Sequence, residues 1–118
     1  TITCGATQAL STSLFALLDP GDEVVLFEPF YEPYLNMVRL AGGVPKRVRL
    51  EPPDWTWRAD ELNAVFSSKT KAVLFNSPHN PTTRVFNATE CQQVVQLARH
   101  YGTWLIHDAV YADWHHPH

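Results

Sequence analysis

The sequence has no excess of basic residues and no cysteine framework, and each absence narrows the possible functions. Against 12 Asp and Glu there are 9 scattered Lys and Arg, which give a formal net charge of -3. Because binding to a phosphate backbone requires a basic stripe, we expect no nucleic-acid partner. The two cysteines, Cys4 and Cys91, are far apart, fit a reducing compartment and are predicted to be buried small side chains.

Long hydrophobic runs are also missing. No stretch approaches the roughly 20 apolar residues of a membrane-spanning helix, and no signal-peptide pattern is present. We therefore expect no membrane partner and a cytoplasmic location. Residues 1–3 resemble a strand already under way, and residues 114–118 stop just after a new element begins. The expectation is one partial domain, residues 1–118, truncated at both ends.

What the sequence does contain is a regular alternation of strand-like and helix-like segments. Runs rich in Val, Leu, Ile and aromatic residues predict strands at 23–27, 44–50, 71–76 and 104–107. Apolar spacing, caps and breakers predict helices at 7–18, 31–41, 59–66 and 88–101. Helices between successive strands favour crossover connections, so the predicted fold is α/β, with helices on both faces of a mainly parallel sheet. The proline-rich segment 51–58 is predicted to be a surface excursion.

Two candidate binding features come early in the chain. Gly5, Ala6 and Thr7 lie between a strand-like remnant and the helix predicted at 7–18, whose first-turn amides could bind phosphate. A threonine helix cap is the plain alternative. Phe30 and Tyr31 follow a predicted strand, where a planar ligand could stack on a ring. Packing in the core or a hydrophobic staple is the more usual role of such a pair.

Two further candidates come after the third and fourth predicted strands. Asn80 lies in a proline-bounded loop and could donate to an anionic oxygen, unless the loop is an ordinary turn. Asp108 ends what reads as a buried strand, so its carboxylate needs a partner, which could be a helix N-terminus or a ligand. Tyr111 would reach the same place if the chain turns helical after Asp108. Ligands bind at such strand ends in open α/β sheets.

Histidines gather near the end of the sequence, and a metal site is the obvious reading to test. The residues concerned are His107, His115, His116 and His118. They lack acidic or cysteine partners at a firm spacing, and structural zinc sites usually show two spaced ligand pairs. We predict no metal site.

Five motifs together resemble the fold type I, class I and II aminotransferases, which use pyridoxal 5'-phosphate. They are 5–10 (GATQAL), 20–24 (PGDEV), 28–31 (EPFY), 78–82 (PHNPT) and 108–111 (DAVY), and they span nearly the whole chain in the right order. The kynurenine, glutamine and methionine aminotransferases are the most similar branch. The resemblance implies part of a large, cofactor-binding domain, amino acid and 2-oxo acid substrates, and a homodimer in the complete protein.

The resemblance also implies roles for individual residues. Gly5, Ala6 and Thr7 would bind the cofactor phosphate, and Tyr31 would stack on the pyridine ring. Asp108 would pair with the ring nitrogen and keep it protonated. Asn80 and Tyr111 would donate to the phenolic oxygen of the ring, as implied by the same family pattern.

The sequence departs from the family pattern in three ways. Thr83 stands where the family usually has glycine, and Ala109 where it usually has glutamate. No lysine follows Tyr111, and the three lysines present lie in the wrong motifs to form the Schiff base: Lys46, Lys69 and Lys71. We therefore assign no catalytic residue to this chain and expect it to be inactive alone.

Three other readings remain open. A carbon–sulfur lyase of the same fold would use the same cofactor for different chemistry. The effector domain of a transcription regulator would use the same scaffold for sensing. A structural α/β module without cofactor is the third.

Overall fold

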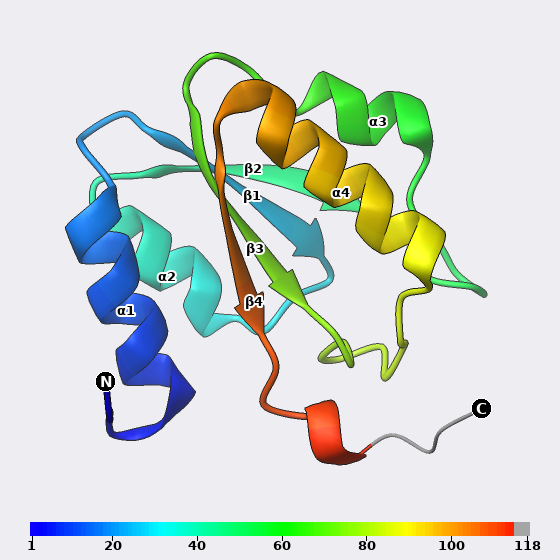
Figure 1. The fold of residues 1–118 in the computed structure, drawn as a ribbon, viewed down its shortest axis with the longest axis horizontal. Helices are drawn as coiled ribbons and strands as arrows, with labels where there is room; N and C mark the ends of the chain where they lie inside the picture. The colour runs from blue at the N-terminus through cyan, green and yellow to red at the C-terminus, as the bar shows by residue number, and fades with distance from the viewer. Residues whose placement is uncertain (115–118) are drawn as a thin grey trace.

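Four parallel strands form the centre of the molecule in the computed structural model, which describes residues 1–114 (Figure 1). In chain order they are β1 (Glu23–Glu28), β2 (Val44–Arg49), β3 (Thr70–Asn76) and β4 (Trp104–Asp108). Their order in the sheet is β2-β1-β3-β4, with every neighbouring pair parallel. All four therefore end at the same edge of the sheet, as the predicted fold class requires.

Helices cover both faces of this sheet (Figure 1). They are α1 (Gly5–Leu17), α2 (Pro33–Leu40), α3 (Ala59–Ala64) and α4 (Ala88–Tyr101), and a 3-10 turn, η1 (Ala112–Trp114), follows β4. Helices α1 and α2 pack on one face through Leu14 and Val38, and α3 and α4 on the other through Leu62 and Val94. The predicted three-layer α/β/α architecture is confirmed.

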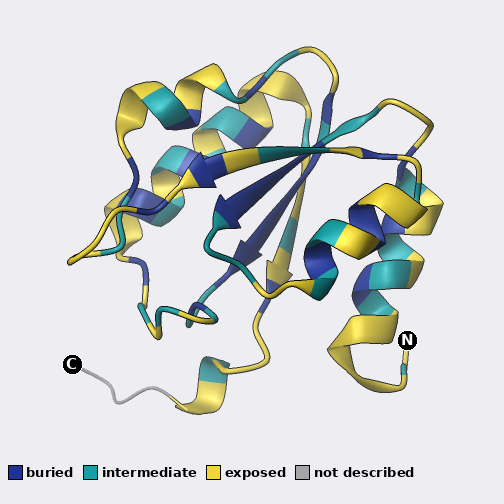
Figure 2. Cartoon of the chain, turned by 180° about the vertical axis from the view of Figure 1, so that it is seen from behind, coloured by how far each residue is buried: buried dark blue, intermediate teal, exposed yellow. Residues whose placement is uncertain are grey.

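Local sequence explains where several elements begin and end. Helix α2 starts at Pro33, whose fixed φ suits the first helical turn. Helix α4 has the predicted capping box between Asn87 and Glu90, and it ends at Gly102 with a left-handed φ of 65°. The central strand β1 is buried from Val24 to Phe27 because helices cover both its faces (Figure 2).

Strand β4 differs from the prediction that it is a buried strand. It is the last strand in the sheet order, and Trp104 at its start is 58 % exposed. Most of the strand is exposed (Figure 2), and only Asp108, at its carboxyl end, is buried. A run of apolar residues does not reveal whether a strand lies at the centre or at the edge of a sheet, because burial depends on its neighbours.

Three smaller predictions were wrong. Residues 1–3 form no strand, since no neighbouring strand within the described residues pairs with them, and Ile2 is fully exposed. Cys4 is exposed and Cys91 half-buried, because each lies on a helix or helix end rather than in the core. The segment 51–58 is irregular, but Trp57 is buried against Phe27, with 5.1 Å between ring centroids, so its indole belongs to the core.

Candidate functional site

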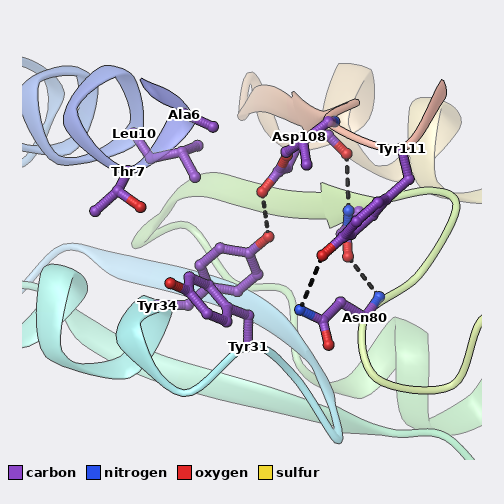
Figure 3. Close-up of a pocket in the computed structure, with 10 residues that line it drawn as sticks. Ala6, Thr7, Leu10, Tyr31, Tyr34, Asn80, Asp108 and Tyr111 are labelled. Atoms are coloured by element: carbon purple, nitrogen blue, oxygen red, sulfur yellow. Dashed lines mark hydrogen bonds between the residues drawn. The ribbon is translucent and has the colours of Figure 1, made fainter. Parts of the chain in front are cut away.

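A cavity of about 190 Å³ lies at the carboxyl edge of the sheet (Figure 3). Segments far apart in the sequence form it: the first turns of α1, the segment before α2 with the first turn of that helix, and the ends of β3 and β4 with the loops that follow them. The lining residues are Ala6, Thr7, Leu10, Tyr31, Tyr34, Asn76, Asn80, Asp108, Val110 and Tyr111. Parallel strands place their carboxyl ends together, and this is the usual binding edge of α/β sheets.

Asp108 is the acidic residue of this cavity. Its side chain is at the end of β4, the residue is 8 % exposed, and its Oδ1 accepts a hydrogen bond of 3.2 Å from the amide of Val110. Its Oδ2 accepts one of 2.5 Å from the hydroxyl of Tyr34. Both donors are neutral, and the described lining residues include no Lys, Arg or His. A buried carboxylate paired only with neutral donors can attract a cationic ligand group.

Two tyrosines line the cavity near Asp108: Tyr34, in the first turn of α2, and Tyr31, two residues before that helix begins. Tyr34 is 3 % exposed, and burial together with the hydrogen bond to Asp108 raises its pKa well above the ordinary value, so its hydroxyl stays a donor. The ring of Tyr31 meets it edge to face, with 5.5 Å between centroids, and remains 38 % exposed at the cavity. Phe30, in contrast, packs against the core. Of the neighbouring aromatic pair, Tyr31 is the ring available to a ligand.

The loop after β3 and the loop after β4 meet at Asn80 and Tyr111. The amide Nδ2 of Asn80 lies 3.5 Å from the hydroxyl of Tyr111 (Figure 3). Asn76 holds the two loops together. Its Nδ2 donates to the carbonyl of Asp108 at 2.9 Å, and its Oδ1 accepts from the amide of Asn80 at 2.7 Å. Two polar side chains with donor groups therefore stand beside the buried carboxylate.

The first turn of α1 closes the cavity on the opposite side. Ala6 and Thr7 line it, and Gly5 precedes them with a φ of 77°, a conformation that suits glycine. The threonine-cap alternative is wrong: Cys4 is the N-cap residue, it makes no side-chain cap bond, and Thr7 lies inside the helix. The amino end of the helix, with its positive dipole, thus faces the same cavity as Asp108.

The structure brings six of the seven predicted residues to the cavity lining, and Gly5 stands directly before it. Sequence reasoning missed Tyr34 and Asn76. Tyr34 was missed because a tyrosine in a helix is usually a packing residue, although its position three residues after Tyr31 was a usable signal. Asn76 was assigned to a strand end without a role, yet a polar residue ending a buried strand was a usable signal.

The three lysines do not line the cavity. Lys46 lies in the first half of β2 and pairs with Glu23 at 3.5 Å, and the other two stand at the amino end of β3. Of the histidine cluster, only His107 is described, and its Nε2 lies 3.1 Å from the carbonyl of Ser77. His115, His116 and His118 lie outside the described residues. Within residues 1–114, no three His, Cys, Asp or Glu side chains are placed to hold a metal ion.

The model of the family described as aminotransferase class I and II matches residues 1–117 of this chain. The chain belongs to this family. It is 42 % identical over 120 residues to kynurenine–oxoglutarate transaminase 3 of Homo sapiens, which covers 93 % of the chain. It is 37 % identical over 111 residues to the methionine aminotransferase of Escherichia coli K12, which covers 94 %.

Solved aminotransferase structures share the fold. An Escherichia coli protein whose structure identified a methionine aminotransferase function matches with a TM-score of 0.90 at 37 % identity, covering 94 % of the chain and 29 % of that structure. A double mutant of Thermus thermophilus aspartate aminotransferase matches with a TM-score of 0.88 at 35 % identity, covering 92 % and 28 %. The chain spans 26 % of the human relative and 29 % of the bacterial one. In the described part of this family member, no helix is long and apolar enough to cross a membrane.

Proposed function

We propose that this chain is part of the large domain of an enzyme that transfers an amino group from an amino acid to a 2-oxo acid with the help of pyridoxal 5'-phosphate. The observation that carries the proposal is the cavity in which the Asp108 carboxylate, two polar donors and a helix amino end converge. The family membership and the names of the relatives support it. They also favour kynurenine or methionine as amino donor.

The residues of the cavity fit this cofactor in their chemistry. Asp108 is buried with neutral partners, so it can pair with a protonated ring nitrogen. Asn80 and Tyr111 offer donors for a ring oxygen, and the amino end of α1 suits a phosphate. The exposed ring of Tyr31 can cover one face of a planar ligand.

Each residue would then have a distinct task. Asp108 would hold a proton on the ring nitrogen, while Asn80 and Tyr111 would fix the opposite side of the ring. Gly5, Ala6 and Thr7 would anchor the phosphate, and Tyr31 would exclude water from the ring. When bound, pyridoxal 5'-phosphate supplies a carbonyl group that carries the amino group and a ring that withdraws electrons from it.

The covalent and proton-transferring lysine would come from another part of the complete protein. None of the three lysines here lines the cavity, so this chain would contribute cofactor binding rather than proton transfer. We also propose that the complete protein is a homodimer with sites near the subunit interface, which its mass in solution would test.

The experiment is an amino-transfer assay on the complete protein loaded with pyridoxal 5'-phosphate. L-kynurenine, L-methionine and L-glutamine are offered with a 2-oxo acid, and the new amino acid is measured. We expect transfer, and we expect Asp108→Asn to lower kcat/KM by about 100-fold or more, since it removes the charge opposite the ring nitrogen.

Asp113→Asn is the matched control, because Asp113 is an exposed acid in η1, five residues further on. It should leave kcat/KM unchanged. Release of a thiol from a cysteine conjugate without any 2-oxo acid would favour the lyase reading. Full activity of Asp108→Asn, or no cofactor binding by the complete protein, would contradict the proposal.

A further inference from the structure

We propose that Tyr34 is a positioning residue that acts through Asp108 and so decides how strongly the site prefers a ligand with a protonated ring nitrogen. This inference rests on the proposed cofactor site and deepens it. It begins from one contact: the Tyr34 hydroxyl donates to Oδ2 of Asp108 at 2.5 Å, joining residues 74 positions apart.

The contact holds one of the two carboxylate oxygens in place. Oδ1 of Asp108 is held by the amide of Val110. Oδ2 is held by the hydroxyl of Tyr34 (Figure 3). Neither bond brings a positive charge, so the carboxylate keeps its full charge for a ligand. Hydrogen bonds to an ionised acceptor are about twice as strong as neutral ones, so this pair of donors fixes the side-chain orientation.

Tyr34 suits this role because packing in the core holds its side chain in place. Its residue is 3 % exposed, and it packs in the core cluster with Met37 and Val38 on the same helix. Burial and the bond to Asp108 both keep its hydroxyl protonated by raising its pKa. A rigid donor of this kind holds the carboxylate in one orientation more firmly than a mobile surface side chain would.

The same side chain also orients the stacking ring. Tyr31 and Tyr34 meet edge to face with centroids 5.5 Å apart and an interplanar angle of 84°. Tyr34 thus contacts both Asp108, proposed to pair with the ring nitrogen of the cofactor, and Tyr31, proposed to cover the face of that ring. It therefore positions both groups relative to each other. Removing only its hydroxyl leaves the ring contact and separates the two effects.

The test measures affinity of the complete protein for two ligands: pyridoxal 5'-phosphate and its analogue with carbon in place of the ring nitrogen. The ratio of the two dissociation constants is the preference. In Tyr34→Phe we expect this preference to fall about tenfold, as the loss of one charge-assisted hydrogen bond implies. The affinity for the analogue itself should be unchanged. A merely structural defect would instead lower the affinities for both ligands equally.

A double-mutant cycle with Asp108→Asn separates action through Asp108 from a direct effect. In the Asp108→Asn protein, which has lost the charge, adding Tyr34→Phe should leave the preference unchanged. Tyr101→Phe is the matched control, because Tyr101 stacks on Phe66 with centroids 5.6 Å apart and does not line the cavity. It should leave both affinities as they are.

A measurement on the unaltered protein covers the case in which Tyr34→Phe does not fold. The hydroxyl proton of Tyr34, assigned by selective labelling, should shift in the NMR spectrum when pyridoxal 5'-phosphate binds and stay in place with the analogue. Equal shifts with both ligands, or an unchanged preference in folded Tyr34→Phe, would overturn the inference alone. Failure of the unaltered protein to bind the cofactor would overturn the proposed function as well.

Discussion

Thr83 is a β-branched residue with a φ of 62°, in the loop that carries Asn80. Its amide donates to the carbonyl of His79 at 2.7 Å, and this bond holds the loop in its tight conformation. Left-handed backbone is strained for such a side chain by about 1–2 kcal/mol, whereas glycine adopts it freely. This explains physically why the family pattern has glycine at this position.

We expect Thr83→Gly to raise the free energy of unfolding by about 0.5 to 1 kcal/mol, after allowing for the greater chain entropy of glycine in the unfolded state. Urea unfolding of the 118-residue chain measures it. Thr89→Gly is the control, because Thr89 is exposed in the first turn of α4 and its backbone is helical. There the same change should lower the free energy of unfolding. A loss of stability in both variants would count against strain at Thr83.

The buried His79 should make the stability of the chain depend on pH. Its ring is buried against Phe86, and burial lowers its pKa from 6.5 to about 4, with a hydrogen bond to the backbone of Phe27 opposing the shift. The unfolded chain therefore binds a proton at a higher pH than the folded one. The contribution of neutral His79 to the free energy of unfolding should be complete above about pH 6.5. As the pH falls toward 4, the chain should lose this contribution, which is on the order of 3 kcal/mol.

Unfolding measured between pH 7 and 4.5 tests this expectation. His79→Gln removes the titrating group, so stability should depend less on pH even if it is lower at pH 7. His100→Gln, at an exposed position of α4, should keep the dependence of the unaltered chain. If His79→Gln loses stability with acid as steeply as the original, another group is responsible.

At the scale of elements, the amino end of α4 connects three segments. Glu90 completes the capping box with Asn87, accepts from Thr56 at 3.0 Å, and forms an ion pair of 2.8 Å with Arg84. Arg84 also donates to the carbonyl of Trp55 at 3.0 Å. The pair is largely buried, with side chains 21 % and 10 % exposed. It ties the loop that carries Asn80 to both the helix and the segment 51–58.

We expect Glu90→Gln to lower the free energy of unfolding by roughly 2 kcal/mol, because it leaves the Arg84 charge half-buried without its partner. Thermal or urea unfolding gives the value. Asp60→Asn is the control: it breaks the Arg58–Asp60 pair of 3.0 Å, whose side chains are 62 % and 68 % exposed, and should change stability little. Equal effects of the two substitutions would contradict the importance of burial.

Most elements could be predicted from the sequence, because their signals are local. The bounds predicted for α4 are those observed, since a capping box and a glycine stop mark its two ends. The predicted start of α2 at Tyr31 was wrong by two residues, because the helix begins at Pro33. Neither the exposure of β4 nor the burial of Trp57 has a local signal, since both depend on which segment packs alongside.

At the scale of the whole molecule, the lysines lie away from the cavity. Parallel strands put the cavity at their carboxyl ends, while Lys69 and Lys71 stand at the amino end of β3. We therefore expect the 118-residue chain alone to form no specific lysine adduct with pyridoxal 5'-phosphate at neutral pH. Absorbance, followed by borohydride reduction and peptide mass spectrometry, tests this. A single lysine modified in full would contradict it.

The sequence by itself determined the α/β class and the order of elements, because periodicity and caps are properties of neighbours along the chain. The resemblance of its motifs to a known family implied the six residues that line one cavity. Only the tertiary structure decided that Tyr34 holds Asp108 and that Asn76 joins the loops of Asn80 and Asp108. Those contacts join residues as much as 74 positions apart. Sheet order and helix packing create them, and no local pattern encodes that geometry.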